Sequence, residues 1–96
     1  MIRSFRNQGT EDLFNGVDSK AARKLCAQTA MEAAMKRLVA LEAAKDLGDL
    51  KSPGYQLEKL KKARAGQHAI PINDQYRLCF IWADHAAEEV EVTDYH

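Results

Sequence analysis

The feature that most constrains the fold is a change of hydrophobic period at Gly54. Between Ser19 and Ala44 the chain has no Gly or Pro, and apolar residues recur every three or four positions, as on one face of a helix. After Gly54 apolar and polar residues alternate, which is typical of half-buried strands. Because helices precede strands, residues 1–96 predict a single α+β domain, with N-terminal helices packed on one face of a small, curved, antiparallel-rich sheet.

Shorter segments complete the first half of the chain. Thr10 is the expected N-cap of a brief helix that has acidic residues in its first turn, and Gly16 ends that helix. The long apolar stripe forms either one helix or two, with residues 26–29 as the possible break. The expected elements are an extended segment at 2–5, a helix at 9–14, one or two helices within 19–44 and a turn of helix at 46–51.

The second half predicts an antiparallel meander of three or four strands. Residues 76–82 have aromatic and aliphatic side chains on one face, so Arg77 leaves from the opposite, open face. Pro71 has no backbone N–H, and its strand is therefore expected to be at an edge or bulged there. A loop is expected at 83–87. The expected strands are residues 55–60, 67–73, 76–82 and 88–93.

The net charge of zero is a cancellation between two parts of the chain. Residues 1–82 hold all 14 basic residues and nine acidic ones, whereas residues 83–96 hold five acidic residues and no Lys or Arg. A local basic patch, and not the sum, sets the potential that a polyanion meets. Two interpretations stay open: a basic surface for nucleic acid, or a basic and an acidic strand that neutralise each other. The basic cluster consists of Lys59, Lys61, Lys62 and Arg64.

Several classes of protein are excluded by missing signals. The sequence has no P-loop, GxGxxG, HExxH or GxSxG motif, so no nucleotide cofactor or catalytic metal is expected. Cys26 and Cys79 have no ligand-spaced partners, which argues against zinc and fits a reducing cytoplasm. No apolar run approaches the roughly 18 residues that cross a bilayer, so no membrane partner is expected.

The remaining polar residues of the second half suit metal-free cleavage of RNA. That reaction needs a base for the 2′-hydroxyl, cations for the charge developing on phosphorus, and an acid for the leaving 5′-oxygen. Each residue also has a structural explanation: Arg77 could pair with Asp74 or a strand glutamate, and His68 is expected to be a partly buried, hydrogen-bonded histidine. The candidates are Glu58, Lys61, Arg64, Arg77, Asp94, Tyr95 and His96.

Three segments resemble the HigB (plasmid-maintenance killer) toxins of the RelE superfamily. They are residues 1–5, the string from Gln56 to Trp82 that includes GQH and NDQYRLCFIW, and the closing VTDYH. The resemblance implies a RelE-like α+β ribonuclease of the bacterial cytoplasm that cuts mRNA in the decoding site of the ribosome. It also implies inhibition by a HigA-like helix-turn-helix antitoxin, through which the toxin meets operator DNA.

The resemblance also assigns residues. Arg77 matches the sheet arginine that stabilises the scissile phosphate, and Lys61 matches a basic residue of the segment that binds RNA together with Lys59, Lys62 and Arg64. The terminal Asp94, Tyr95 and His96 match the catalytic or substrate-positioning group.

The chain also departs from the family pattern. Glu58 stands where many members have a histidine, so the general base is open, and Gln56 and Pro71 stand where members commonly have arginines. Two function classes therefore remain: a ribosome-dependent endoribonuclease toxin, and a catalytically weak interaction module of the same fold that serves as antitoxin partner and operon co-regulator. A generic small α+β domain is a third, plainer interpretation.

Overall fold

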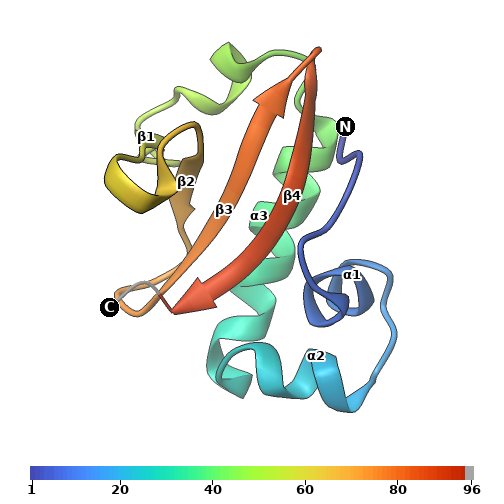
Figure 1. Ribbon diagram of the computed structural model, residues 1–96. Coiled ribbons are helices and arrows are strands. Elements are labelled where there is room, and N and C mark those ends of the chain that lie inside the picture. The colour runs from blue at the N-terminus through green and yellow to red at the C-terminus, as the bar shows by residue number, and fades with distance from the viewer. Residues whose placement is uncertain (95–96) are drawn as a thin grey trace.

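A computed structural model describes residues 1–94 of the chain. Helices come first and strands follow, as the change of period predicts (Figure 1). The helices are α1 (Gln8–Phe14), α2 (Lys20–Leu25), η1 (Gln28–Ala30), α3 (Met31–Ala43), η2 (Leu47–Leu50) and η3 (Lys62–Arg64). The strands are β1 (Glu58–Lys59), β2 (His68–Pro71), β3 (Tyr76–Ala83) and β4 (Ala86–Asp94).

The four strands form one antiparallel sheet in the order β1-β2-β3-β4. Figure 1 looks onto this sheet, with α3 behind β3 and β4 and nothing helical in front of them. Leu38 and Leu41 of α3 are fully buried against the sheet residues Leu78, Phe80 and Val90. Burial of such side chains contributes roughly 1.5–3 kcal/mol each, so this layer of contacts fixes the helices on one face. We call the other face the open face.

The helix boundaries confirm most expectations and correct one. The N-cap of α2 is Ser19, whose hydroxyl accepts from Ala22 N, and the helix ends where Cys26 adopts an extended conformation, so the long stripe is two helices. The N-cap of α1 is Asn7, whose Oδ1 accepts from Thr10 N. The prediction that Thr10 is the cap is wrong, because Thr10 lies inside the helix with its side chain fully buried.

Two strand boundaries also differ from expectation. The first strand contains only Glu58 and Lys59, because residues 53–57 form a turn and irregular backbone before it. The expected loop at 83–87 is a tight hairpin turn in which Asp84 and His85 both have positive φ, and β4 begins directly after it. Two consecutive positive φ values are the mark of a type I′ turn, for which Asn-Gly and Asp-Gly are the strongest sequence signals. Here His85 stands in place of the glycine, so the sequence did not indicate the turn.

The outer edge of β4 is covered by the N-terminal segment, residues 1–6. This segment is extended, as expected, and bridges β4 in parallel at Ile2 and Phe5. Arg3 N and Arg6 N donate to carbonyl oxygens of β4. Farther along, Val92 N donates to the Thr10 hydroxyl at 3.1 Å. An uncovered edge would invite pairing with other chains, so this segment and α1 close the sheet on one side.

Pro71 lies at an edge, as its missing N–H requires. β1 pairs with β2 only at His68 and Ala69, so beyond Ala69 the β1 side of β2 is unpaired. Ile72 N donates to Tyr76 O, and because N–H groups alternate in direction along an antiparallel strand, the nitrogen of Pro71 points away from β3. The proline therefore costs the sheet no hydrogen bond. No helix among residues 1–94 has the length and apolarity needed to span a bilayer.

Candidate functional site

The open face is organised by two rows of residues that cross the sheet. The first row runs through Glu58, Ala69, Cys79 and Glu91, one from each strand. The second row runs through Pro71, Arg77 and Thr93. Side chains directly opposite each other on neighbouring strands share a face. Arg77 and Glu58 therefore lie on the same face, which for Arg77 is the open face that the sequence predicts.

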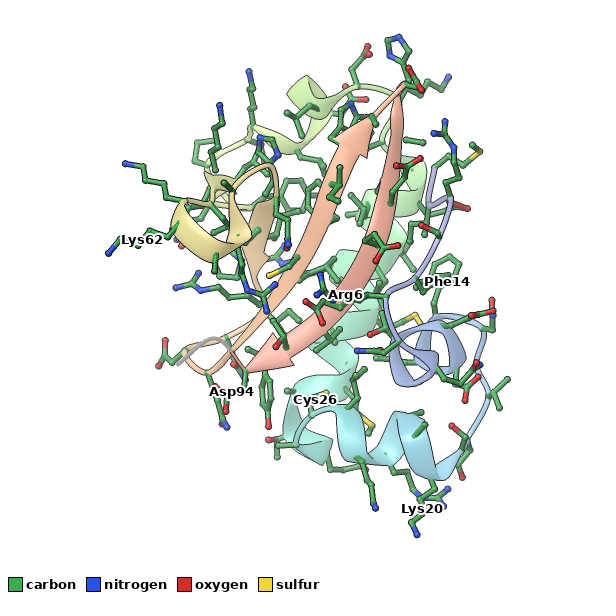
Figure 2. All side chains as sticks on the ribbon, in the orientation of Figure 1. Arg6, Phe14, Lys20, Cys26, Lys62 and Asp94 are labelled. Carbon is green, nitrogen blue, oxygen red and sulfur yellow. The ribbon has the colours of Figure 1, made fainter. Side chains whose placement is uncertain are left out.

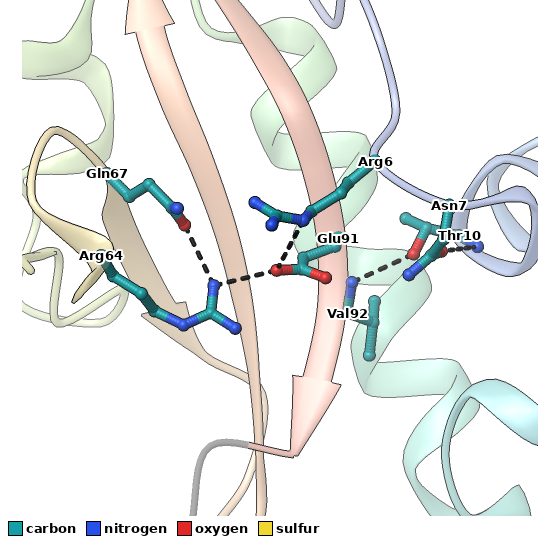
Figure 3. A network of polar contacts seen from close by, with 7 residues as sticks. All are labelled: Arg6, Asn7, Thr10, Arg64, Gln67, Glu91 and Val92. Atoms are coloured by element: carbon teal, nitrogen blue, oxygen red, sulfur yellow. Dashed lines mark hydrogen bonds and ion pairs between the residues drawn. The ribbon is translucent and has the colours of Figure 1, made fainter.

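Glu91 is the centre of a polar network on this face (Figure 3). The residue is 8% exposed, although it carries a charge. Its Oε1 accepts a hydrogen bond from Arg64 Nη1 at 2.9 Å, and Arg6 Nε lies 3.8 Å from the same oxygen. Arg64 Nη1 also lies 3.1 Å from Gln67 Oε1. Removing a carboxylate from water costs several kcal/mol unless it is paired and hydrogen-bonded, and these arginines supply that compensation.

This network bears on the two interpretations that the charge pattern left open. Glu91 of the acidic strand β4 lies among the basic side chains of Arg6 and Arg64. Arg64 reaches from η3 across the sheet to β4. The interpretation in which basic and acidic segments neutralise each other therefore holds for Arg64 and Glu91.

The register of β3 and β4 places the end of the acidic strand next to Arg77. Thr93 lies directly across from Arg77, and Asp94 lies across from Tyr76. Gln75 Nε2 donates to Asp94 Oδ2 at 3.0 Å, so the turn before β3 holds this carboxylate. Tyr95 and His96 lie outside the described residues. Asp94 therefore follows the residue that lies opposite Arg77, and as the partner of Tyr76 it shares the face of Tyr76.

The remaining members of the basic cluster lie at the β1 edge. Glu58, Lys59, Lys61 and Lys62 line an open hollow of about 430 Å³ together with Leu60. All four charged residues are exposed. Figure 2 shows the Lys62 side chain extending away from the sheet. An exposed group of three lysines around one hollow provides a mobile positive surface, whereas Arg64 provides a fixed one.

A small apolar patch lies beneath these charges. Leu60, Ala69 and Cys79 are buried against one another on the open face. Burial raises the pKa of the Cys79 thiol above its ordinary value, which favours the unreactive thiol form. Cys79 therefore serves as a small apolar packing residue.

His68 lies on the opposite, helix-covered face. Its ring stacks on Phe80 with centroids 6.1 Å apart, and it is partly buried, as predicted. The expectation of a hydrogen-bonded histidine is wrong for one ring nitrogen, because Nδ1 is buried and has no hydrogen-bond partner among the described residues. Burial, and then the nearby charges of Lys59 and Lys51, lower the pKa of the imidazole.

Glu91, Arg6 and Gln67 belong to the network but were not predicted, although Glu91 had a signal. Val90 and Val92 face the helices, so alternation alone places Glu91 on the open face. Arg6 carried no signal, because it reaches the site through a parallel bridge between distant segments. Within residues 1–94, no three His, Cys, Asp or Glu side chains are grouped in a way that could hold a metal ion.

Comparisons with known proteins agree with this geometry. A family model described as the RelE-like toxin of type II toxin-antitoxin system HigB matches residues 3–96. The Endoribonuclease HigB of Proteus vulgaris is 32% identical over 97 residues, and the match covers 100% of both chains.

Solved structures from Staphylococcus aureus share the fold. A YoeB-YefM complex matches with a TM-score of 0.60 at 14% identity, covering 100% of this chain and 98% of that one. A heterotetrameric YoeB-YefM toxin-antitoxin complex matches with a TM-score of 0.58 at 18% identity and the same coverage. The matches confirm the resemblance and the α+β fold class predicted from the sequence.

Proposed function

Because the chain belongs to the HigB-like family of RelE-like toxins of type II toxin–antitoxin systems, we propose that it is a metal-independent endoribonuclease that cuts mRNA on the ribosome. The name of its relative from Proteus vulgaris supports the endoribonuclease activity. The open face, which carries cations and carboxylates and is not covered by helices, supports a site for RNA on this chain.

Arg77 is the proposed stabiliser of the scissile phosphate. In metal-free cleavage the ribose 2′-oxygen attacks phosphorus, the bond to the 5′-oxygen breaks, and negative charge grows on the phosphate oxygens in between. A guanidinium offers planar, paired donors to such oxygens. Arg64 is the second proposed cation, and Lys59, Lys61 and Lys62 are the proposed contacts to the RNA backbone along the β1 edge.

The proton transfers are assigned to carboxylates and to the terminal residues. Glu58, on the same face as Arg77, is the proposed base that takes the proton of the 2′-hydroxyl. Asp94, Tyr95 and His96 are the proposed terminal group that positions the RNA and returns a proton to the 5′-oxygen. The observation that carries this proposal is the register, which places Thr93 opposite Arg77 and so begins the terminal group beside the arginine.

The proposed partners follow from the family. An antitoxin is supported by the family description and by the solved toxin–antitoxin complexes of the same fold. We propose further that this antitoxin is a HigA-like helix-turn-helix protein, that it links the toxin to operator DNA, and that the ribosome with its mRNA is the target. The proposed location is the bacterial cytoplasm.

The test is expression of the protein without its antitoxin, followed by mapping of mRNA 5′ ends within minutes. Growth arrest and cuts in phase with the reading frame are expected, and both should be lost in Arg77→Ala and after deletion of His96. Arg23→Ala is the matched control, because Arg23 is an exposed arginine on α2 that pairs with the nearby Asp18. Full expression of folded protein without arrest would overturn the endoribonuclease.

One observation favours a second function. Arg64 is already bound to Glu91, and Glu58 and Pro71 replace a histidine and an arginine common in the family. A site with fewer available cations suits a catalytically weak module that serves as antitoxin partner and operon co-regulator. In that case the antitoxin complex should bind operator DNA as usual, while the toxin alone leaves mRNA intact.

A further inference from the structure

A second hollow lies behind the β1 edge, on the side of the sheet away from Arg77. Its volume is about 420 Å³, which is within the range of small-molecule sites. Leu47, Pro53 and Leu57 are the apolar residues that line it, and we call them its apolar wall. Lys51, Lys59 and His68 line it as well. The hollow therefore combines apolar side chains with cationic groups.

The charge around this hollow is of one sign. Among the described residues that line it, two are lysines and none is a carboxylate. The field of these two lysines reaches His68, whose pKa they lower in addition to the larger effect of burial. A neutral imidazole beside two ammonium groups suits a ligand that has one anionic group and one uncharged polar group.

The imidazole of His68 is held in a fixed orientation. Its ring stacks on the fully buried Phe80 at an interplanar angle of 21°. Nδ1 is buried, and nothing in residues 1–94 forms a hydrogen bond with it. Because an unsatisfied N–H costs more than an unsatisfied acceptor lone pair, the proton of the neutral ring belongs on Nε2. His68 therefore contributes a rigid hydrogen-bond donor at a site that has no assigned use.

Lys59 connects this hollow to the basic edge. It lines both the hollow behind β1 and the hollow formed with Lys61 and Lys62. A polyanion bound to Lys61 and Lys62 can therefore extend past β1 into the hollow behind it and remain close to lysine side chains along the whole path. Proteins that bind single-stranded nucleic acid combine such a backbone track with apolar or aromatic surfaces for bases.

We propose that the hollow lined by Lys51, Lys59 and His68 is a subsite for one nucleotide of the bound RNA. Its phosphate lies between the two lysines, and its base lies against the wall of Leu47 and Leu57. An inorganic anion would use the lysines alone, whereas a nucleotide also uses the apolar wall. This inference rests on the proposed function, because it extends the RNA path from the open face to the back of β1.

The test uses a 2′-O-methylated RNA hexamer, which binds but cannot be cut, and the full-length protein. Lys51→Ala should weaken binding at least threefold and reduce the slope of log affinity against log salt by about 0.7, the value for one phosphate contact on a single strand. Lys20→Ala is the matched control, because Lys20 is an exposed lysine on α2, far along the chain from the hollow (Figure 2). Neither position is buried, so both variants should fold.

A second measurement addresses the base. A hexamer that carries 5-iodouridine should photocrosslink to the segment 51–57 or to His68, and Lys51→Glu should abolish the crosslink. Equal affinities of Lys51→Ala and Lys20→Ala would refute the subsite while leaving the proposed ribonuclease intact.

Two further outcomes would also count against the subsite. An effect of Lys51→Ala on antitoxin binding alone would assign the hollow to a protein partner. Absence of any RNA binding by the unmodified protein would remove the proposed function and the subsite together.

Discussion

The hydrogen bond between Thr10 and Val92 predicts a specific loss of stability. Thr10 Oγ1 accepts from Val92 N at 3.1 Å, and both residues are buried, with Thr10 at 0% and Val92 at 2% exposure. Thr10→Val keeps the shape of the side chain but leaves the Val92 N–H without an acceptor. An orphaned buried donor costs about 1–3 kcal/mol. Thr and Val have similar helix propensities, so α1 itself contributes little to the change.

The assay is urea denaturation followed by circular dichroism, with a thermal scan beside it. A loss of 1 kcal/mol corresponds to roughly 4–8 °C in a domain of this size. Thr10→Ser retains the hydroxyl and loses one methyl, so it should cost about 1 kcal/mol by a different mechanism. Thr29→Val, at an exposed threonine, is the matched control. A free energy of unfolding for Thr10→Val within 0.5 kcal/mol of the unmodified protein would refute the reasoning.

Three more predictions follow from buried or crowded positions. Glu91→Gln removes the carboxylate that Arg6 and Arg64 share, so the free energy of unfolding should fall by about 1–2 kcal/mol. The affinity for RNA should also depend more steeply on salt concentration, and an unchanged dependence would contradict this. Gly9→Ala places a Cβ 2.7 Å from the carbonyl oxygen of Ala21, so it should destabilise by about 1–3 kcal/mol, whereas Gly48→Ala, with open space around it, should not. The pKa of His68 is lowered below its ordinary value of 6.5, so the unfolded chain takes up a proton more readily, and stability should be full above pH 6.5 and fall as the pH decreases below it. Denaturation between pH 7 and 5 should show a flatter profile for His68→Gln.

Much of the fold followed from local pattern. The period change at Gly54 gave the order of elements, and the alternation in 76–82 gave the face of Arg77. The hairpin turn at Asp84 and His85 was missed because neither central residue is a glycine, although Asp and His adopt positive φ more often than most other residues. The boundary of α1 was missed because Asn7 and Thr10 are both residue types that cap helices, and only burial separates their roles.

The sequence by itself determined which residues face together, since the periods of helix and strand are properties of neighbouring residues. It thereby determined the α+β class, the burial of the stripe in α3 and the face of β3 from which Arg77 leaves. Only the tertiary structure decided which distant side chains meet. Arg64 and Glu91 are 27 residues apart, and Arg6 reaches Glu91 across the edge of β4. Such contacts depend on how distant segments pack along the edge of the sheet and on the free-energy cost of burying a carboxylate without a counter-charge. The spacing of apolar residues along the chain contains neither kind of information.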